Sequence, residues 1–180
     1  MSHAHQQNAP MAHLIDWQGF ERLEVMGPVI QLLSPPDRAR ASPCILRGVV
    51  PPGVCIPLHS HDDPETFIQI SGELEGLSET GGKFVWSRMR PGDVFHVPAN
   101  ARHAFRNRSS EPAASIIVTT AKLAGFLRDI GLPATGDAPS RGAPSPERIS
   151  QFLSLAEKLG YWNASPQENA RLGLMPAQPG

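Results

Sequence analysis

Three histidines and one glutamate, separated by turn residues, most strongly constrain what this chain can fold into. His59 and His61 lie two positions apart, followed by Asp-Asp-Pro and then by Glu65. In an extended strand, residues two apart share a face, so both imidazoles would point to the same side. Asp-Asp-Pro favours a turn, which would bring Glu65 beside them at the start of the next strand.

A fourth donor comes from later in the chain. The turn signature Arg-Pro-Gly-Asp, a short apolar run and a second turn precede His103, which opens a predicted strand over 103–107. Imidazole and carboxylate ligands without a thiolate suit divalent Fe, Ni, Mn, Zn or Cu. The residues therefore predict one divalent transition metal as cofactor, with its identity open. The predicted metal ligands are His59, His61, Glu65 and His103.

These donors and the glycines around them resemble the two motifs of the cupin family. The first motif is a glycine, five residues, His-x-His, three or four residues, a glutamate, six residues and a glycine. It is matched by Gly53, His59, His61, Glu65 and Gly72. The second motif is matched by Gly92, Pro98, His103 and Asn107. One position departs, since Asn100 stands where the family has glycine, but Asn is the residue that best tolerates a left-handed backbone after glycine.

The resemblance implies an all-β fold, the cupin jelly roll or double-stranded β-helix, here with C-terminal α-helices. Short apolar runs broken by Pro and Gly agree with an all-β barrel. We expect an N-terminal tail or arm over 1–22, the barrel over 23–120 and a helical extension over 121–180. Apolar residues at helical spacing predict helices over 121–130 and 146–159. A Pro-rich linker over 133–144 would join them. The partner surface of the second helix, its own barrel mouth or a neighbouring subunit, stays open.

Strand parity suggests which side chains surround the metal. Phe67 and Gln69 share a face with Glu65, and Cys55 shares one with His59. With Phe105 they form the predicted substrate pocket, although ordinary barrel core would give the same pattern. Three arginines could instead hold an acidic substrate or simply be solvated: Arg47, Arg102 and Arg106.

Composition excludes several classes of partner. The chain has 180 residues, 16 basic and 17 acidic, with a formal net charge of -1, so no net field attracts nucleic acid or an anionic membrane. No segment has the apolar length of a membrane span, and a cytoplasmic location is expected. Two cysteines, Cys44 and Cys55, fit a reducing compartment. The resemblance further suggests a homodimer.

Several functions remain open for such a site. The first hypothesis is a metal-dependent oxidoreductase, a quercetin dioxygenase-like enzyme acting on a small enolisable or aromatic molecule. Glu65 would be a metal ligand and, in resemblance to some relatives, also the catalytic base. One alternative is an isomerase or lyase that uses the metal as a Lewis acid, which a Lys, Arg or Tyr in the pocket would favour. Another is a non-catalytic cupin that binds or senses a metabolite.

Overall fold

Alternation of buried and exposed side chains along the strands shapes the fold. In the strand that follows the Asp-Asp-Pro turn, Glu65, Phe67 and Gln69 are buried, whereas Ile68 and Ile70 face outward. The strand therefore presents one face to an interior, as a sheet in a two-layer packing must. The structure is a computed structural model that describes residues 12–34, 43–137 and 143–174.

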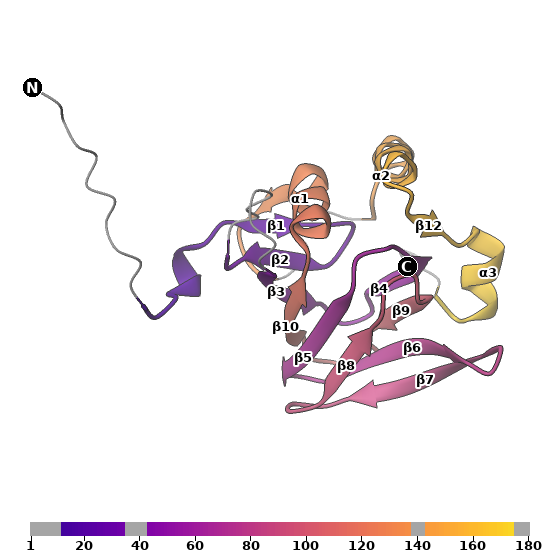
Figure 1. Cartoon of the computed structure of the whole chain (residues 1–180), viewed down its shortest axis with the longest axis horizontal. Coiled ribbons are helices and arrows are strands. Elements are labelled where there is room, and N and C mark those ends of the chain that lie inside the picture. Colours follow the sequence, from indigo (N-terminus) through magenta and orange to yellow (C-terminus); the bar gives the residue numbers. More distant parts are fainter. Residues whose placement is uncertain (1–11, 35–42, 138–142, 175–180) are drawn as a thin grey trace, which may run out of the picture.

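Two antiparallel sheets form the two layers (Figure 1). The seven-stranded sheet has the order β11-β1-β2-β3-β10-β5-β8 and the five-stranded sheet the order β12-β4-β9-β6-β7. The strands of the first are β11 (Leu132–Ala134), β1 (Arg22–Glu24), β2 (Val29–Leu32), β3 (Cys44–Val50), β10 (Ala113–Thr119), β5 (Glu65–Ser71) and β8 (Val94–Val97). Those of the second are β12 (Trp162–Asn163), β4 (Cys55–Ser60), β9 (His103–Arg106), β6 (Leu74–Thr80) and β7 (Lys83–Met89). This arrangement is the expected all-β jelly roll, which is confirmed.

Turn chemistry fixes the longest hairpin. β6 and β7 pair over their whole length, from Leu74 with Met89 to Thr80 with Lys83. Gly81 and Gly82 between them both have positive φ, +58° and +74°, which is the backbone that a two-residue hairpin turn requires. Asn100 also has a positive φ, +65°, so the predicted left-handed turn at this position is confirmed.

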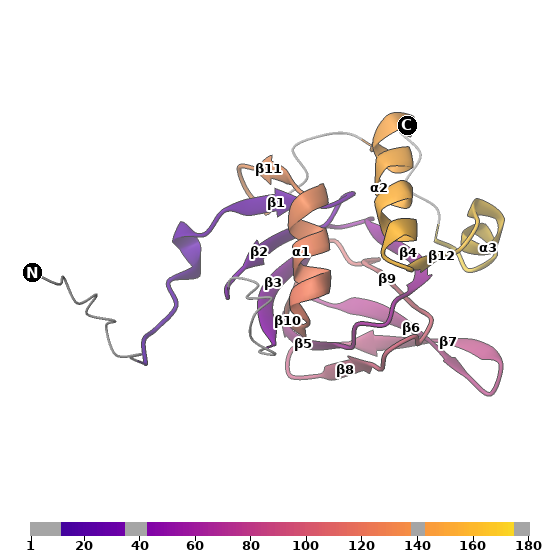
Figure 2. The ribbon, with the colours of Figure 1, turned by 45° about the horizontal axis from the view of Figure 1, so that its top comes forward.

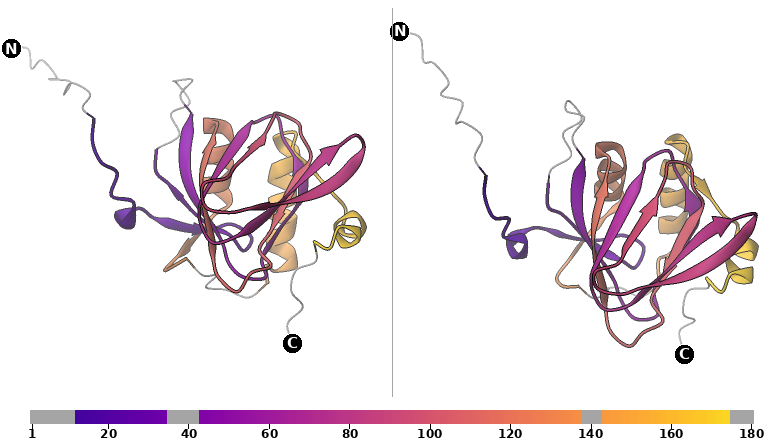
Figure 3. Two further views of the ribbon diagram at one scale, coloured as in Figure 1. Left: turned by 90° about the horizontal axis from the view of Figure 1, so that it is seen from below. Right: turned by 60° about the horizontal axis from the view of Figure 1, so that its bottom comes forward.

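Two α-helices lie on the same side of the sandwich. α1 (Ala121–Ile130) begins where Thr120 accepts a hydrogen bond from the Leu123 amide, and it buries Leu123 and Phe126. α2 (Pro146–Lys158) begins at the N-cap Ser145. Figure 2 shows α1 over the seven-stranded sheet and α2 over the side where β4 and β12 lie. Seen from below in Figure 3, both helices lie behind the strands. The predicted helices over 121–130 and 146–159 are confirmed to within one residue.

The C-terminal part is more closely joined to the barrel than the sequence suggested. Within the expected linker 133–144, β11 pairs with β1, and residues 138–142 lie outside the described part. Proline has no backbone N–H to donate, but β11 is an edge strand with a neighbour on one side only. Pro133 is therefore tolerated there. β12 pairs with β4, and a third helix follows, α3 (Pro166–Arg171). The extension therefore adds one strand to each sheet.

Other expectations concern the start of the chain and the membrane. A single 3-10 turn, η1 (Trp17–Gly19), lies in the predicted N-terminal arm 1–22, of which residues 1–11 fall outside the described part. Across the described ranges, no helix combines the length and apolarity needed to cross a bilayer.

Candidate metal centre

The four predicted ligands come from both sheets and meet at one end of the sandwich. His59 lies near the end of β4 and is the cross-strand partner of His103, the first residue of β9. His61 follows β4 directly, and Glu65 opens β5 in the opposite sheet. Strand pairing therefore brings two imidazoles together, while the turn between β4 and β5 delivers the third imidazole and the carboxylate.

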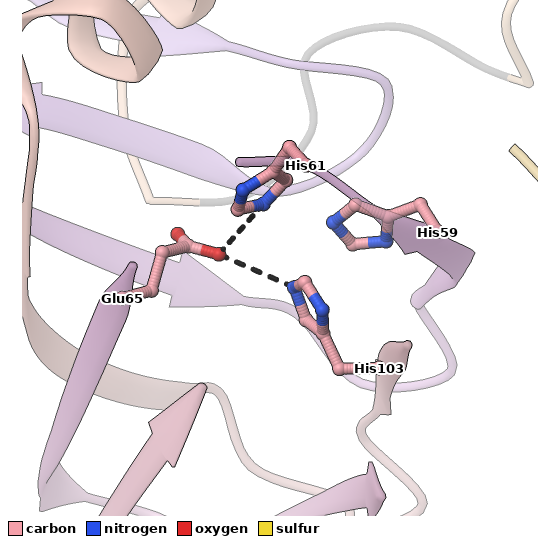
Figure 4. A group of neighbouring side chains, drawn as sticks. All are labelled: His59, His61, Glu65 and His103. Carbon is pink, nitrogen blue, oxygen red and sulfur yellow. Dashed lines mark hydrogen bonds and ion pairs between the residues drawn. The ribbon is translucent and has the colours of Figure 1, made fainter. Parts of the chain in front are cut away.

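The donor atoms converge (Figure 4). One ligand atom from each of the four residues lies within 4.8 Å of the others. Glu65 Oε2 is 3.1 Å from His61 Nε2 and 3.2 Å from His103 Nε2. The rings of His59 and His103 have centroids 4.1 Å apart. This cluster could hold a single metal ion, as the sequence analysis predicted.

Backbone carbonyls orient all three imidazoles. His59 Nδ1 lies 2.7 Å from the Pro57 oxygen, and His61 Nδ1 lies 2.8 Å from the Asp63 oxygen. His103 Nδ1 lies 2.9 Å from the Ala101 oxygen. Because a carbonyl only accepts, each Nδ1 must donate its proton there, and each Nε2 lone pair is turned to the centre. The tautomers are thus set for metal ligation.

The charge of the cluster is set by burial and by mutual contact. Burial, followed by the neighbouring His103 and His61, lowers the pKa of His59 to about 3, so this ring is neutral. Burial acts to raise the pKa of Glu65, but the adjacent rings of His103 and His61 outweigh it and lower that pKa to about 2. A neutral imidazole beside a carboxylate is the charge state that a divalent cation needs.

One observation tests whether a metal fits. His61 Nε2 is buried without a hydrogen-bond partner, although buried polar atoms are almost always satisfied. The Glu65 oxygen lies 3.1 Å from it. Burial acts to lower the pKa of His61, but the contact with Glu65 outweighs it and raises that pKa, so this position attracts positive charge, while a neutral His61 whose Nδ1 carries the proton cannot donate from Nε2. A cation between them would satisfy both atoms, so the residues fit a metal ion.

An apolar cavity of about 160 Å³ adjoins the four ligands. Its walls come from both sheets, and helices α1 and α2 close it through Leu123, Phe126, Leu127, Phe152 and Ala156. The second helix therefore packs against the mouth of its own barrel. No lysine, arginine or aspartate belongs to this wall among the described residues. Apart from the ligand Glu65, the metal site thus faces a small chamber without charged side chains.

The predicted pocket residues fall into two groups. Cys55, Phe67 and Phe105 line the cavity, and the two phenylalanine rings are in contact, with centroids 4.4 Å apart. Gln69 lies outside the wall, which corrects that expectation. Its amide nitrogen donates to the Ser71 carbonyl oxygen at 2.7 Å, and its amide oxygen accepts from the Ser115 hydroxyl at 2.6 Å. Strand parity gave the right face, but at this level the wall is formed by Ser115, the cross-strand partner of Gln69.

The arginines considered for an acidic substrate have other partners. Arg47 pairs with Asp137, and Arg106 pairs with Glu75. Arg102 stacks over the ring of Trp162. None of the three arginines lines the cavity.

Three residues of the site were not found by sequence reasoning. Tyr161 and Asn163, from the C-terminal extension, line the cavity. Asp63, which sequence reasoning treated only as turn material, accepts a hydrogen bond from the Tyr161 hydroxyl at 2.6 Å. Tyr161 follows the predicted helix over 146–159, and nothing in the local pattern says that a residue there points into a barrel.

Comparison with known proteins identifies the fold. Residues 46–119 match the family described as "Cupin domain". A predicted oxalate decarboxylase from Thermotoga maritima superposes with a TM-score of 0.50 at 19% identity, covering 60% of this chain and 98% of its own. An uncharacterized conserved protein with a double-stranded beta-helix domain from Klebsiella pneumoniae superposes with a TM-score of 0.50 at 19% identity. This match covers 70% of this chain and 100% of that one.

A third structure, Drosophila melanogaster CENP-C bound to CAL1, gives a TM-score of 0.51 at 14% identity, covering 59% of this chain and 85% of that one. At these identities the similarity concerns the fold alone. No curated protein matches the chain. The shared architecture therefore says nothing specific about the reaction, which must be argued from the site.

Proposed function

Residues 46–119 match the family described as "Cupin domain", and we propose that the chain is a metal-dependent oxidoreductase of this kind, a dioxygenase acting on a small, uncharged, enolisable or aromatic molecule. The observation that carries the proposal is the juxtaposition of four convergent donors and an apolar cavity of about 160 Å³. A cavity of this volume is the size that holds a benzene-sized molecule.

The donors would be His59, His61, His103 and Glu65. A bound divalent transition metal would supply Lewis acidity and, if redox-active, a route for electrons between an enolate and dioxygen. Glu65 is the one carboxylate among the described residues of the cavity wall. It is thus the group placed to take the proton from an acidic carbon or hydroxyl of the substrate.

The cavity wall would orient the substrate and exclude water. Phe67, Phe105 and Phe126 offer flat apolar surface that orients a planar substrate and keeps water from the reacting carbon. Within the described part of the chain, no lysine or arginine belongs to the wall, so a dianionic substrate would have only the metal to pair with both of its buried charges, and this disfavours it. The volume also disfavours large flavonols, so the proposal narrows the expected quercetin dioxygenase-like activity to smaller molecules.

One observation bears on the lyase or isomerase alternative. Tyr161 lines the cavity and could offer a phenol for such chemistry. Burial, together with the hydrogen bond to Asp63, raises the pKa of Tyr161, and its hydroxyl proton is already directed to Asp63. A phenol held in this way keeps its proton and is a poor base, which disfavours a lyase or isomerase that would use Tyr161 as its base.

The test begins with elemental analysis of protein purified without added metal. The protein is then loaded separately with Fe(II), Ni(II) and Mn(II), and oxygen consumption is followed with small diketones and catechols, with flavonols as the oversized comparison. We expect substrate-dependent oxygen uptake with the small molecules and none after Glu65→Gln. Conversion without oxygen uptake would indicate a lyase or isomerase, and saturable binding without conversion would indicate a sensor.

A further inference from the structure

Tyr161 connects the C-terminal extension to the ligand-bearing turn between β4 and β5. It lies outside the matched residues 46–119, is 8% exposed, and donates its hydroxyl proton to Asp63 Oδ2 at 2.6 Å. Thr120 donates to the other oxygen of the same carboxylate. Lys122 Nζ lies 3.9 Å from the same Oδ2. A buried carboxylate with two hydroxyl donors is held in one rotamer, because losing either bond would cost the desolvation of the group left behind.

The end of α2 explains how Tyr161 reaches this position. Gly160 has φ +78°, its amide donates to the Glu157 oxygen, and the Tyr161 amide donates to the Ala156 oxygen. These two bonds with a left-handed glycine form a Schellman motif, which reverses the chain sharply at a helix end. The reversal turns the side chain of Tyr161 back under α2 and into the sandwich.

Asp63 in turn contacts the metal ligand His61. Its carbonyl oxygen accepts the Nδ1 proton of His61 at 2.8 Å, so the position of residue 63 sets the orientation of the His61 ring. Tyr161 also contacts that ring directly, with ring centroids 5.3 Å apart. Of the three imidazoles, His61 is the one whose Nε2 is buried without a hydrogen-bond partner.

The strand after Tyr161 fastens the same segment to another ligand. In β12, Trp162 pairs with Ser60 and Asn163 pairs with His59. The Ala164 amide donates to the Leu58 oxygen at 2.9 Å. The segment 161–164 is therefore in register with the part of β4 that carries His59, and Tyr161 cannot shift without moving this pairing.

We propose that Tyr161 is a positioning residue of the metal centre, which holds His61 in its ligating orientation through Asp63. The C-terminal extension is then part of the metal site and not merely a cover over the barrel. This inference rests on the metal binding in the proposed function, but it does not depend on which reaction follows. It predicts that loss of the Tyr161 hydroxyl weakens metal binding, although Tyr161 is not a metal ligand.

The experiment compares Co(II) binding by the full-length wild-type chain, Tyr161→Phe and the control Trp162→Phe. Co(II) affinity is measured by competition with a chelator, and the visible absorption of the Co(II) protein reports ligand geometry. Tyr161→Phe keeps the ring in the cavity and removes only the bond to Asp63. We expect an affinity loss of about 10- to 100-fold, typical when a group supporting a ligand is removed, and a changed Co(II) spectrum. Trp162 lies in the same segment, and we expect its variant to match the wild type.

Thermal unfolding of the metal-free proteins separates positioning from stability. A purely structural role would lower the unfolding temperature of Tyr161→Phe and leave the Co(II) affinity and spectrum unchanged, which would overturn the proposal. An equal loss of affinity in Trp162→Phe would overturn it too. If Tyr161→Phe does not fold, Asp63→Asn takes its place, because it changes the acceptor of the same hydrogen bond. Its Co(II) affinity and absorption spectrum are then measured, with the same expected results. Failure of the wild type to bind Co(II) would overturn both proposals, whereas a normal Tyr161→Phe would overturn this one alone.

Discussion

Gly72 lies against the backbone of Pro112, so that a Cβ atom at residue 72 would be 2.3 Å from the Pro112 carbonyl oxygen. Its φ is +67°, a conformation that costs other residues about 1–2 kcal/mol. Replacement by alanine adds a clash with rigid backbone to this cost. We expect Gly72→Ala to lower the free energy of unfolding by about 2–4 kcal/mol in urea titrations.

Gly53 provides the matched control. It also has a positive φ, +75°, but a Cβ atom at residue 53 would have no neighbour within 4 Å among the described residues. Gly53→Ala should therefore cost only the backbone term, about 1 kcal/mol. Equal losses in the two variants would show that the approach to Pro112 does not matter.

The ligand set predicts how metal content responds to mutation. Glu65→Gln removes the only negative donor of the cluster while keeping the side-chain shape, and we expect the affinity for a divalent metal to fall by more than about 100-fold. His96→Gln is the control, because His96 pairs with Thr66 at 3.0 Å and is not in the cluster. Metal-to-protein ratios after dialysis measure both. Retention of metal by Glu65→Gln at the level of the control would contradict the assignment.

The size of the cavity predicts which variant blocks ligands without disturbing the metal. Ala156 is 1% exposed and lines the cavity from α2. Ala156→Leu would fill part of the roughly 160 Å³ volume and should weaken binding of benzene by about tenfold or more. The metal content should stay at the wild-type level. Benzene affinity, measured from the rise in unfolding temperature with concentration, tests this, and unchanged affinity would place the ligand elsewhere.

The ion pair between Arg47 and Asp137 predicts a pH effect on stability. Their nearest atoms are 2.8 Å apart. The hydrogen bonds from Arg47, with a smaller contribution from Arg22, outweigh the burial of the carboxyl and hold the pKa of Asp137 below its usual 3.8. A lowered folded-state pKa stabilises the folded form above the unfolded-state value, and this stability is lost as the pH falls through the folded-state value.

Asp137→Asn should therefore be less stable than the wild type by no more than about 1 kcal/mol at pH 7, because the carboxylate is partly exposed. The difference should remain constant down to a pH of about 5 and shrink below 3.8. Urea midpoints at a series of pH values measure it. A difference that grows as the pH falls would have the wrong sign for this ion pair.

Local pattern was sufficient where chemistry and geometry are both local. The parity of β5 and the turn before Glu65 gave the burial of Glu65 and Phe67 from a few adjacent residues. The starts and stops of α1 and α2 were equally visible in caps and spacing. Gln69 shows the limit of parity, which gives the face of a strand but not which of two neighbouring side chains forms the wall of a cavity, here Ser115.

The role of the C-terminal extension could not be read in the same way. Tyr161 and Asp63 are 98 positions apart, and no local signal relates them. β11 and β12 are too short, with three and two residues, to show a period. Each exists because a neighbouring strand offers unpaired hydrogen-bonding groups, which is a property of the assembled sheet.

By itself, the sequence predicted an all-β fold, and its resemblance to the cupin motifs implied the jelly roll. It also identified the four convergent donors, because motif spacing and strand pleat act over a few residues. Only the tertiary structure decided that α2 closes its own barrel, that the chamber is small and apolar, and that Tyr161 lies against His61 and its supporting Asp63. These features depend on which distant surfaces pack together, and packing is settled by the whole set of buried side chains rather than by any one segment.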